Sequence, residues 1–304
     1  MSTLRNYITV IGSSNTDLVL TCQNLPQPGE TVLGGAFEQF AGGKGANQAV
    51  AAARALRKES TDLKVAFVGL CGDDDYGKKA CRGLRDENIN VRYFKRRADF
   101  PSGVALIMIG GKKRENIIAV AKSANDALGE TEIEAAEVLL QRSKVVLCQL
   151  EIPLEAVTAA ARITREYGGL FILNPAPARA LPRKLYAQIH TITPNENEAL
   201  QLTGESTIRS AAKKLHHWGC QNVAITLGAK GVLLYNENGF RQIAAPRVKP
   251  LDTVGAGDCF NGWLAAGLAE GKSLDEAAEL AVRAASVSVM RQGAQKGMPF
   301  RDEI

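Results

Sequence analysis

Several signatures that define other protein classes are missing from this chain of 304 residues. Its six cysteines lie far apart without a CxxC pair, and no histidine stands at metal-ligand spacing, which argues against a zinc site or a disulfide framework. No apolar run approaches the roughly 18 residues of a membrane span, and the first residues do not resemble a signal peptide. We therefore expect reduced cysteines, no membrane contact and a cytosolic location.

Charge of one sign is not concentrated in a tail. The net charge of +5 is modest, and Lys and Arg are spread among acids, which argues against a nucleic-acid partner. Two basic clusters stand out, Arg92 with 95–97 and Lys112 with 113–114; they predict solvated hairpin tips or attraction of an anionic substrate. The Walker A pattern is also absent, because Lys44 and Lys230 are each followed by Gly.

Short apolar runs alternate with helical patterns along most of the chain. Strands are predicted at 7–11, 64–70, 145–150, 170–173, 191–193 and 222–227, and helices at 44–57, 77–87, 130–141, 153–167 and 208–218. This alternation predicts an α/β fold with a mostly parallel sheet covered on both faces. Such sheets bind ligands at the carboxyl ends of their strands, so we expect the active site in loops that follow strands.

Two segments interrupt the alternation and look like β-hairpins. They are residues 17–40, and residues 92–121 with apolar runs at 104–109 and 116–121. We predict that they form a small β-sheet beside a main domain made of 1–16, 41–91 and 122–304. Because a sheet of this size is marginal alone, it would close over the ligand as a lid or pair with another copy.

The strongest chemical signal is the run DTVGAGD at 252–258, which leads directly into a helical pattern. Small residues just before a helix let backbone N–H groups point at an anion, and the helix dipole adds to the attraction. Asp258 would stand at the helix start and accept a proton from an attacking hydroxyl during phosphoryl transfer. An ordinary N-cap is the alternative, because Asp is favoured there.

A second glycine-rich run, GGKGANQ at 42–48, opens an Ala-rich helix. Lys44 and Asn47 supply donors for hydroxyl groups, although a plain glycine-rich turn explains the run as well. Asn15 and Asp17 follow the first predicted strand and would point into the same crevice. An amide and a carboxylate two residues apart can bind vicinal diols, and a turn with local side-chain hydrogen bonds is the alternative.

Three more polar segments follow predicted strands. Glu151 ends the run at 145–150, but it would also suit a helix start. The acids of NENE at 195–198 would hold Mg²⁺ through water, and capping of the next helix explains them about as well. The segment TLGAKG at 226–231 fits nucleotide phosphates or a plain hairpin.

Taken together in this order, these runs resemble the PfkB carbohydrate kinase family from Tyr7 to Arg301. The runs at 252–258 and 42–47 match the family's two signatures. The full GGKGANQ run, QLE at 149–151 and NPAPA at 174–178 look like the ribokinase branch more than like adenosine kinases or fructokinases. The resemblance implies a three-layer α/β/α fold with a β-sheet lid, and transfer of a phosphoryl group from ATP to the 5-hydroxyl of D-ribose.

The resemblance also implies roles for residues of this chain. Asp258 would deprotonate the hydroxyl, and Gly255, Ala256 and Gly257 would form the anion hole. The residues implied to hold the sugar are Asn15, Thr16, Asp17, Gly43, Lys44, Gly45, Ala46, Asn47, Glu151 and Asp258. Those implied to contact ATP are Asn195, Thr226, Leu227, Gly228, Ala229, Lys230, Gly231 and Gly257.

Two ions and a second subunit are implied in the same way. Glu198 would organise Mg²⁺ through water. A monovalent-cation site, normally K⁺, maps mostly through carbonyls onto Asp252, Val254, Ser288, Arg291, Gly293 and Gly297. The lid would also make the contact of a homodimer.

The sequence departs from the family pattern at two positions and leaves rival functions open. Gly297 falls where similar enzymes often have Ser, so one side-chain oxygen is missing from the K⁺ site. Val282 falls where a polar or ring-bearing residue often faces the adenine. One rival is a related kinase acting on deoxyribose, another sugar or a nucleoside. The other is a non-catalytic sugar or nucleotide sensor, which loss of Asp258 or of the anion-hole glycines would favour.

Overall fold

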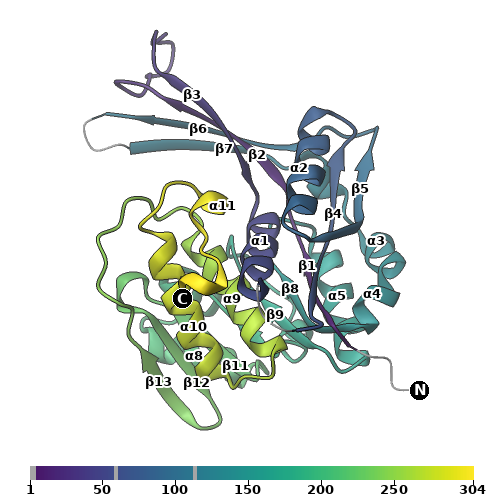
Figure 1. Ribbon diagram of the computed structural model, residues 1–304. Helices are drawn as coiled ribbons and strands as arrows, with labels where there is room; N and C mark the ends of the chain where they lie inside the picture. Colours follow the sequence, from purple (N-terminus) through teal and green to yellow (C-terminus); the bar gives the residue numbers. More distant parts are fainter. Residues whose placement is uncertain (1–4, 58–60, 112–114) are drawn as a thin grey trace.

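A large sheet lies between two layers of helices, and a smaller sheet projects from one end of this body (Figure 1). The structure is a computed structural model that describes residues 5–57, 61–111 and 115–304. The large sheet has nine strands in the order β13-β12-β11-β10-β9-β8-β1-β4-β5, and all neighbours are parallel except the pairs β11–β12 and β12–β13. The predicted α/β class with a mostly parallel sheet is confirmed.

The strands of the large sheet correspond closely to the apolar runs. They are β1 (Tyr7–Ile11), β4 (Lys64–Gly72), β5 (Asn90–Arg97), β8 (Ser143–Cys148), β9 (Leu170–Leu173), β10 (Thr191–Ile192), β11 (Asn222–Thr226), β12 (Val232–Asn236) and β13 (Gly239–Ile243). Both faces of the central strands are buried, and successive side chains enter different cores. In β8, Val145 and Leu147 pack on one side of the sheet and Val146 and Cys148 on the other.

Each core is closed by its own set of helices. One face is covered by α1 (Lys44–Leu56), α2 (Asp75–Asp86), α9 (Ala256–Ala269) and α10 (Leu274–Ser288). The other is covered by α3 (Glu130–Ala135), α4 (Glu137–Gln141), α5 (Leu154–Glu166), α6 (Arg183–Tyr186), α7 (Glu196–Thr203) and α8 (Ile208–His217). The short helix α11 (Ala294–Gly297) follows α10. Of the helices described, none combines the length and apolar character that crossing a membrane requires.

One predicted helix is divided in the structure. The pattern at 130–141 predicts a single helix, and that prediction is wrong, because the chain tightens at Ala136 between α3 and α4. The amide of Ala136 bonds to the carbonyl of Ile133 and the amide of Leu139 to that of Ala136, each three residues back. This tighter spacing interrupts the helix, so α3 ends at Ala135 and α4 begins at Glu137.

The projecting sheet contains both predicted hairpins. Its order is β3-β2-β6-β7, with β2 (Asn15–Thr21) antiparallel to β3 (Ala36–Gly42) and parallel to β6 (Gly103–Gly110), and β6 antiparallel to β7 (Glu115–Ala121). The two hairpins therefore form one small sheet.

The placement of residues 92–97 in the lid is wrong. They lie in β5, which follows α2 and pairs in parallel with β4, so they extend the large sheet. The first basic cluster lies on this edge strand, where Arg96 pairs with Asp73 at 3.0 Å. Lys112, Lys113 and Arg114 of the second cluster lie outside the described residues. The division of the chain into two domains stays a prediction.

The connections reverse direction between β1 and β8. From β1 the chain continues to β4 and β5 on one side, whereas β8 to β11 lie on the other. In open α/β sheets such a switch point opens a crevice at the carboxyl ends of its two strands. The loop after β1 leads directly to Asn15 at the start of β2, and the loop after β8 carries Glu151; both are predicted site residues.

Candidate active site

Glu151 joins three elements at the switch point. Its Oε2 accepts a hydrogen bond from Ser13 Oγ at 2.5 Å and another from the backbone N–H of Lys44 at 3.0 Å. Ser13 follows β1, and Lys44 is the first residue of α1. Because α5 begins only at Leu154, Glu151 is not part of a helix start. It instead ties the first turn of α1 to the loops after β1 and β8.

Asp258 is placed by the packing of α9 against α1. A side chain at Gly262 would lie 2.4 Å from Ala51 Cβ, so the two helices approach closely only because that residue is glycine. Asp258 is only 7% exposed. Its Oδ2 accepts a hydrogen bond from Asn47 Nδ2 at 3.0 Å and its Oδ1 one from Gln48 Nε2 at 2.9 Å.

The N-cap alternative for Asp258 is excluded. The N-cap of α9 is Gly255, with φ 78°, and the helix begins at Ala256. Asp258 therefore lies within the first helical turn. The partial positive charge of that end favours its ionised form.

The carboxylates of Asp258, Glu151 and Glu198 lie around the ammonium group of Lys44, and Asp17 lies near the first two of them. Burial by itself lowers the pKa of Lys44, but the negative charges of Asp258, Glu151 and Glu198 outweigh it and raise that pKa. Burial, together with the charges of Glu151 and Asp258, raises the pKa of Asp17 to about 6. Lys44 is therefore a permanent cation at neutral pH, and it limits the mutual repulsion of the acids around it.

Burial also raises the pKa of Asp258, and its neighbours act against that rise. The charge of Lys44 and the amide donors of Asn47 and Gln48 favour the carboxylate, whereas the charge of Glu151 opposes it. A buried carboxylate with these partners is a stronger base than one in water and can still be ionised. That combination suits a group that must take a proton.

A chain of buried amides extends behind Asp258 and was not predicted from the sequence. Gln48 Nε2 also donates to Asn174 Oδ1 at 3.1 Å, and Gln149 Nε2 donates to Gln48 Oε1 at 2.6 Å. On the lid side, Asn125 Nδ2 donates to Asn15 Oδ1 at 2.8 Å. Gln48, Gln149 and Asn174 all stand in the runs that carry the family resemblance, which was the available signal.

The start of α9 faces open space as an anion hole requires. Gly257 is exposed, and a Cβ added there would meet no atom within 4 Å. Gly255 and Ala256 complete the first turn beside it. N–H groups at a helix N-terminus attract a phosphate oxygen; here the N–H of Ala256 also donates to the carbonyl oxygen of Thr253 at 3.3 Å.

The residues predicted to contact ATP lie on two neighbouring strand ends. Asn195, after β10, forms an isolated parallel bridge with Thr226 at the end of β11. The chain then turns through the exposed residues Gly228, Ala229 and Lys230 into antiparallel β12, so the hairpin alternative for 226–231 describes the backbone correctly. Leu227 and Gly231 are buried at the two ends of this turn.

Glu198 forms the helix cap that was the alternative to its magnesium role. Its Oε2 accepts from the backbone N–H of Asn195 at 2.8 Å, and Asn195 Oδ1 accepts from the backbone N–H of Glu198 at 2.8 Å. The second carboxylate oxygen is separate from this bond. Burial raises the pKa of Glu198, although the cap bond and Lys44 favour its charged form.

The segments assigned to a monovalent cation are brought together in space. Asp252 Oδ1 accepts from the backbone N–H of Val254 at 3.0 Å, and its Oδ2 accepts from that of Gly293 at 2.8 Å. A Cβ at Gly297 would lie 3.1 Å from the carbonyl oxygen of Ser288 and 3.6 Å from that of Arg291. Carbonyl oxygens such as those around Gly297 are suitable ligands for K⁺. Within the described ranges, no group of three or more His, Cys, Asp or Glu side chains could hold a metal ion.

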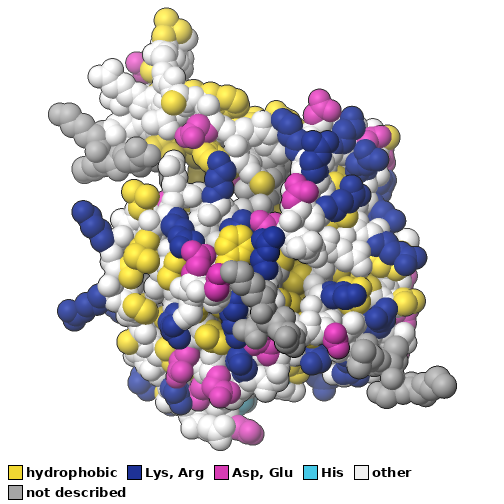
Figure 2. Space-filling view, viewed as in Figure 1, with side chains coloured by type: hydrophobic (Ala, Val, Ile, Leu, Met, Phe, Trp, Pro, Cys, Tyr) yellow, Lys and Arg dark blue, Asp and Glu magenta, His cyan; other side chains and the backbone are white. Residues whose placement is uncertain are grey.

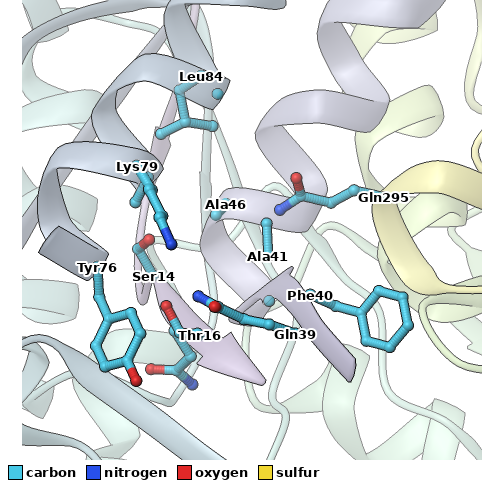
Figure 3. Close-up of a pocket in the computed structure, with 14 residues that line it drawn as sticks. Ser14, Thr16, Gln39, Phe40, Ala41, Ala46, Tyr76, Lys79, Leu84 and Gln295 are labelled. Carbon is cyan, nitrogen blue, oxygen red and sulfur yellow. The ribbon is translucent and has the colours of Figure 1, made fainter. Parts of the chain in front are cut away.

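Thr16 and Ala46 face a different space from the carboxylates. They line a pocket of about 300 Å³ between α2, α1 and the β2–β3 pair, into which Lys79 and Gln39 also point (Figure 3). Alternation along β2 places Thr16 on the face opposite to Asp17. The structure therefore gathers Asp17, Lys44, Asn47, Glu151 and Asp258, while Gly43 and Gly45 shape the backbone around them. Asn15 lines the same pocket as Thr16 and Ala46.

The sequence and the fold are both similar to known proteins. The profile described as pfkB family carbohydrate kinase matches residues 5–301. The ribokinase of Bacillus subtilis is 42% identical over 308 residues, covering 99% of this chain and 98% of the relative. The deoxyribokinase of Salmonella typhi is 35% identical over 303 residues, covering 98% and 97%. The structure of Arabidopsis thaliana ribokinase complexed with ribose and ATP superposes with a TM-score of 0.90 at 31% identity, covering 98% of this chain and 97% of the other.

Proposed function

Because the chain belongs to the pfkB family of carbohydrate kinases, we propose that it transfers the γ-phosphoryl group of ATP to the 5-hydroxyl of D-ribose. The products are ADP and D-ribose 5-phosphate. The observation that carries this proposal is the buried carboxylate of Asp258, which lies at the tip of α9 within the same charge cluster as Asp17, Lys44 and Glu151.

Asp258 acts as the general base. It takes the proton of the 5-hydroxyl as that oxygen attacks the γ-phosphorus, and the bond from phosphorus to the β,γ-bridging oxygen breaks on the opposite side. The electron pair of the broken bond leaves with ADP. The N–H groups at the start of α9, from Gly255 to Gly257, stabilise the charge on the oxygens of the transferring group.

The sugar is held by the polar residues gathered at the switch point. Asn15, Asp17 and Glu151 accept from its hydroxyls, and Asn47 and the backbone around Gly43 approach its ring. A carboxylate beside two vicinal hydroxyls rejects a compound that lacks either of them, because a buried acceptor would then lose its donor. This arrangement favours a free pentose.

ATP occupies the side of the crevice formed by Asn195, residues 226–231 and Gly257. Mg²⁺ would be held through water by the carboxylate oxygen of Glu198 that does not cap α7, and would neutralise phosphate charge. K⁺ would be held by the carbonyl oxygens around Asp252, Ser288 and Gly297, close behind the helix tip. The glycine at 297 leaves that set without a side-chain oxygen, so we expect weaker activation by K⁺.

Deoxyribose is the second candidate substrate. The similarity to a deoxyribokinase, at 35% identity over nearly the whole chain, favours it specifically. The two sugars differ only at the 2-position, so the residues that contact the 2-hydroxyl decide between them. The more hydrogen bonds the protein makes to the 2-hydroxyl, the larger the ratio of kcat/KM for ribose to that for deoxyribose.

A coupled assay of ADP release tests these alternatives. Purified protein with Mg-ATP is given D-ribose, 2-deoxy-D-ribose, D-fructose or adenosine, and kcat/KM is compared with and without K⁺. We expect the highest value with D-ribose. A higher value with 2-deoxy-D-ribose would transfer the proposal to the second candidate, and ADP release from none of them would support the non-catalytic sensor.

We also expect a homodimer formed through the projecting sheet. The face of this sheet that carries Thr16 is apolar: Leu18 lies opposite Leu106, and Leu20 opposite Phe37. Phe37 and Leu106 are 65% and 56% exposed, and hydrophobic side chains are visible along the projecting sheet in Figure 2. A second copy would cover this face. Sedimentation of Leu106→Glu beside the unchanged protein tests it, since loss of the dimer is expected only in the variant.

A cytosolic location fits the same proposal. All six cysteines are free thiols, and five of them are buried. Thiols persist where the compartment is reducing, and ATP is available there.

A further inference from the structure

The two oxygens of Asp258 are held in different ways. Asn47 donates to Oδ2, and its own Oδ1 accepts from Gln295 Nε2 at 3.0 Å, a side chain that also lines the pocket of Figure 3. Gln48 donates to Oδ1 and is completely buried. Asn47 is 6% exposed and is bonded to a residue at that pocket, whereas Gln48 is 0% exposed and cannot contact a ligand.

The amide of Gln48 can present only its nitrogen to Asp258. That nitrogen has two protons, and they go to Asp258 Oδ1 at 2.9 Å and to Asn174 Oδ1 at 3.1 Å. Its oxygen accepts from Gln149 Nε2 at 2.6 Å. If the amide were reversed, its oxygen would face two acceptor oxygens, and the nitrogen of Gln149 would face a donor.

Asn174 is itself fixed in orientation. Its Nδ2 donates to the carbonyl oxygen of Thr193 at 2.9 Å, which leaves its Oδ1 directed at Gln48. Thr193 Oγ1 in turn donates to Asn261 Oδ1 at 2.5 Å, and Asn261 lies on α9 one turn after Asp258. The orientation of Gln48 is thus set from the strand ends and from the helix that carries the base.

We propose that Gln48 is a positioning residue whose amide holds Oδ1 of Asp258 throughout the reaction, so that Oδ2 is the atom that accepts the proton. Asn47 releases Oδ2 when the sugar binds, and the 5-hydroxyl takes its place there. This inference rests on the proposed function. It adds Gln48, which contacts neither substrate and acts only through the general base Asp258.

Every charged or titratable group near Asp258 must be considered in a test based on pH. Lys44 on α1 favours its ionised form, whereas Glu151 after β8, Asp17 on β2 and Glu198 on α7 oppose it. The Cys259 thiol is next to it on α9, and burial raises the pKa of that thiol to about 12, so it stays neutral. Replacement of Gln48 leaves all of these groups in place.

The first test compares Gln48→Met with Gln149→Met. Both remove one buried amide from the same chain of hydrogen bonds, but only Gln48→Met removes a donor from Asp258. For Gln48→Met we expect the acid limb of kcat/KM to move up by about one pH unit, because the carboxylate loses a stabilising donor. We also expect kcat on the plateau to fall about tenfold, with KM for the sugar nearly unchanged.

Gln149→Met is the matched control. Asn174 still orients Gln48 in that variant, so the acid limb should stay where it is in the unchanged protein. An unmoved limb in Gln48→Met, or an equal movement in both variants, would overturn the proposal. Thermal unfolding of both variants measures the structural cost, which we expect to be similar.

A second variant covers the case in which Gln48→Met does not fold. Gln48→Glu is nearly the same size, and its protonated carboxyl can still donate to Oδ1. As pH rises and this group ionises, two carboxylates face each other and activity should fall, which gives an alkaline limb absent from the unchanged protein. An identical pH profile in the two proteins would contradict the inference.

The titration of Asp258 separates this inference from the proposed function. In ligand-free protein with ¹³C-labelled aspartate, the Asp258 resonance is identified by its loss in Asp258→Asn, and its midpoint is followed in Gln48→Met and Gln149→Met. A shift in the first variant alone supports the role of Gln48, even if the unchanged protein proves inactive on D-ribose. No shift in either would overturn the role of Gln48, even if that activity is present.

Discussion

The two sides of the crevice differ in how firmly contacts within the protein hold their residues in place. The acceptor wall consists of Asp17, Lys44, Asn47, Glu151 and Asp258, and all five are buried or half-buried. Hydrogen bonds join Lys44 to Glu151 and Asn47 to Asp258. The nucleotide wall consists of Asn195, Gly228, Ala229 and Lys230, and all four are exposed. The acceptor wall is therefore organised before any ligand arrives, whereas the nucleotide wall offers backbone groups that ATP itself would complete.

Preorganisation carries an electrostatic cost on the acceptor wall. Four acids share this crevice with Lys44, and burial raises the pKa of three of them, Asp17, Glu198 and Asp258. Their repulsion opposes folding, a cost that the proposed function explains, since the same arrangement would bind a polyhydroxyl compound and activate one of its hydroxyls. Substitutions on this wall should change catalysis strongly, and substitutions on the nucleotide wall should change it mildly.

The largest effect is expected from Asp258→Asn. Loss of the general base should lower kcat by roughly 10² to 10⁴, measured by ADP release at saturating D-ribose and ATP. Asp86→Asn, at the end of α2, serves as a control and should leave the rate unchanged. If Asp258→Asn keeps more than a tenth of the rate, Asp258 is not the general base. The expected difference between substitutions on the two walls would then also be wrong.

The start of α9, where the two walls meet, gives the next effect. Gly257 faces open space, so Gly257→Ala should fold normally but place a methyl group where the transferring phosphoryl group lies, which lowers kcat about 10- to 100-fold. Gly255→Ala is the matched variant, because Gly255 has φ 78° and its added Cβ would lie 2.8 Å from Ala294 Cβ.

The expected cost of Gly255→Ala is in stability, about 1 to 3 kcal/mol. Thermal unfolding of the two variants separates the cases. If Gly257→Ala loses stability and keeps its rate, the tip of α9 does not face the phosphoryl group.

A smaller effect is expected from Asp17→Asn, which should stabilise the folded protein and weaken its binding of the sugar. The folded pKa of about 6 lies above the ordinary 3.8, so the folded protein binds more protons than the unfolded chain between these values, and stability falls as pH rises through this window. Above pH 6 the variant should gain on the order of 1 to 2 kcal/mol, a value reduced for partial exposure.

The gain from Asp17→Asn should disappear below pH 4, as measured by denaturant unfolding at pH 4 and pH 8. Binding of the sugar should weaken about tenfold, because one charged acceptor is lost. Equal stability of the two proteins at both pH values would show that Asp17 is not strained in the folded state.

The smallest effect is expected from Lys230→Ala on the nucleotide wall. The side chain is exposed in the turn between β11 and β12, so its attraction for phosphate is screened by solvent. We expect KM for ATP to rise about two- to fivefold, kcat and the melting temperature to stay the same, and the rise to shrink in high salt. A hundredfold loss would mean that this wall is as organised as the other.

Much of the fold followed from local patterns because their physical cause is local. The run at 145–150 predicts a strand with two buried faces, and the structure places Val145 and Val146 in different cores. The run at 252–258 predicts a helix tip open to an anion, and at Gly257 an added Cβ would meet no atom within 4 Å. The periodicity at 130–141 failed at Ala136, because a single tightened turn does not disturb the hydrophobic pattern.

The candidate site depended partly on the resemblance and partly on contacts that no sequence pattern records. The resemblance named Asn47, Glu151 and Asp258, and the structure gathers them. It did not assign Gln48 or Ser13, which hold Asp258 and Glu151 in place. Residues 92–97 were misplaced for a similar reason, because a charged edge strand of a parallel sheet looks like a hairpin arm until its partner β4 is known.

The sequence by itself determined the alternating elements, the two glycine-rich helix starts and the acids that follow strands, since these depend on neighbours within a few turns of chain. Only the tertiary structure decided which amide meets which carboxylate. Gln48 lies 101 residues from Gln149 and 210 from Asp258, and the three are joined because the parallel sheet aligns its strand ends and Gly262 lets α9 lie against α1. Such contacts depend on the packing of whole layers, which no local segment of the chain encodes.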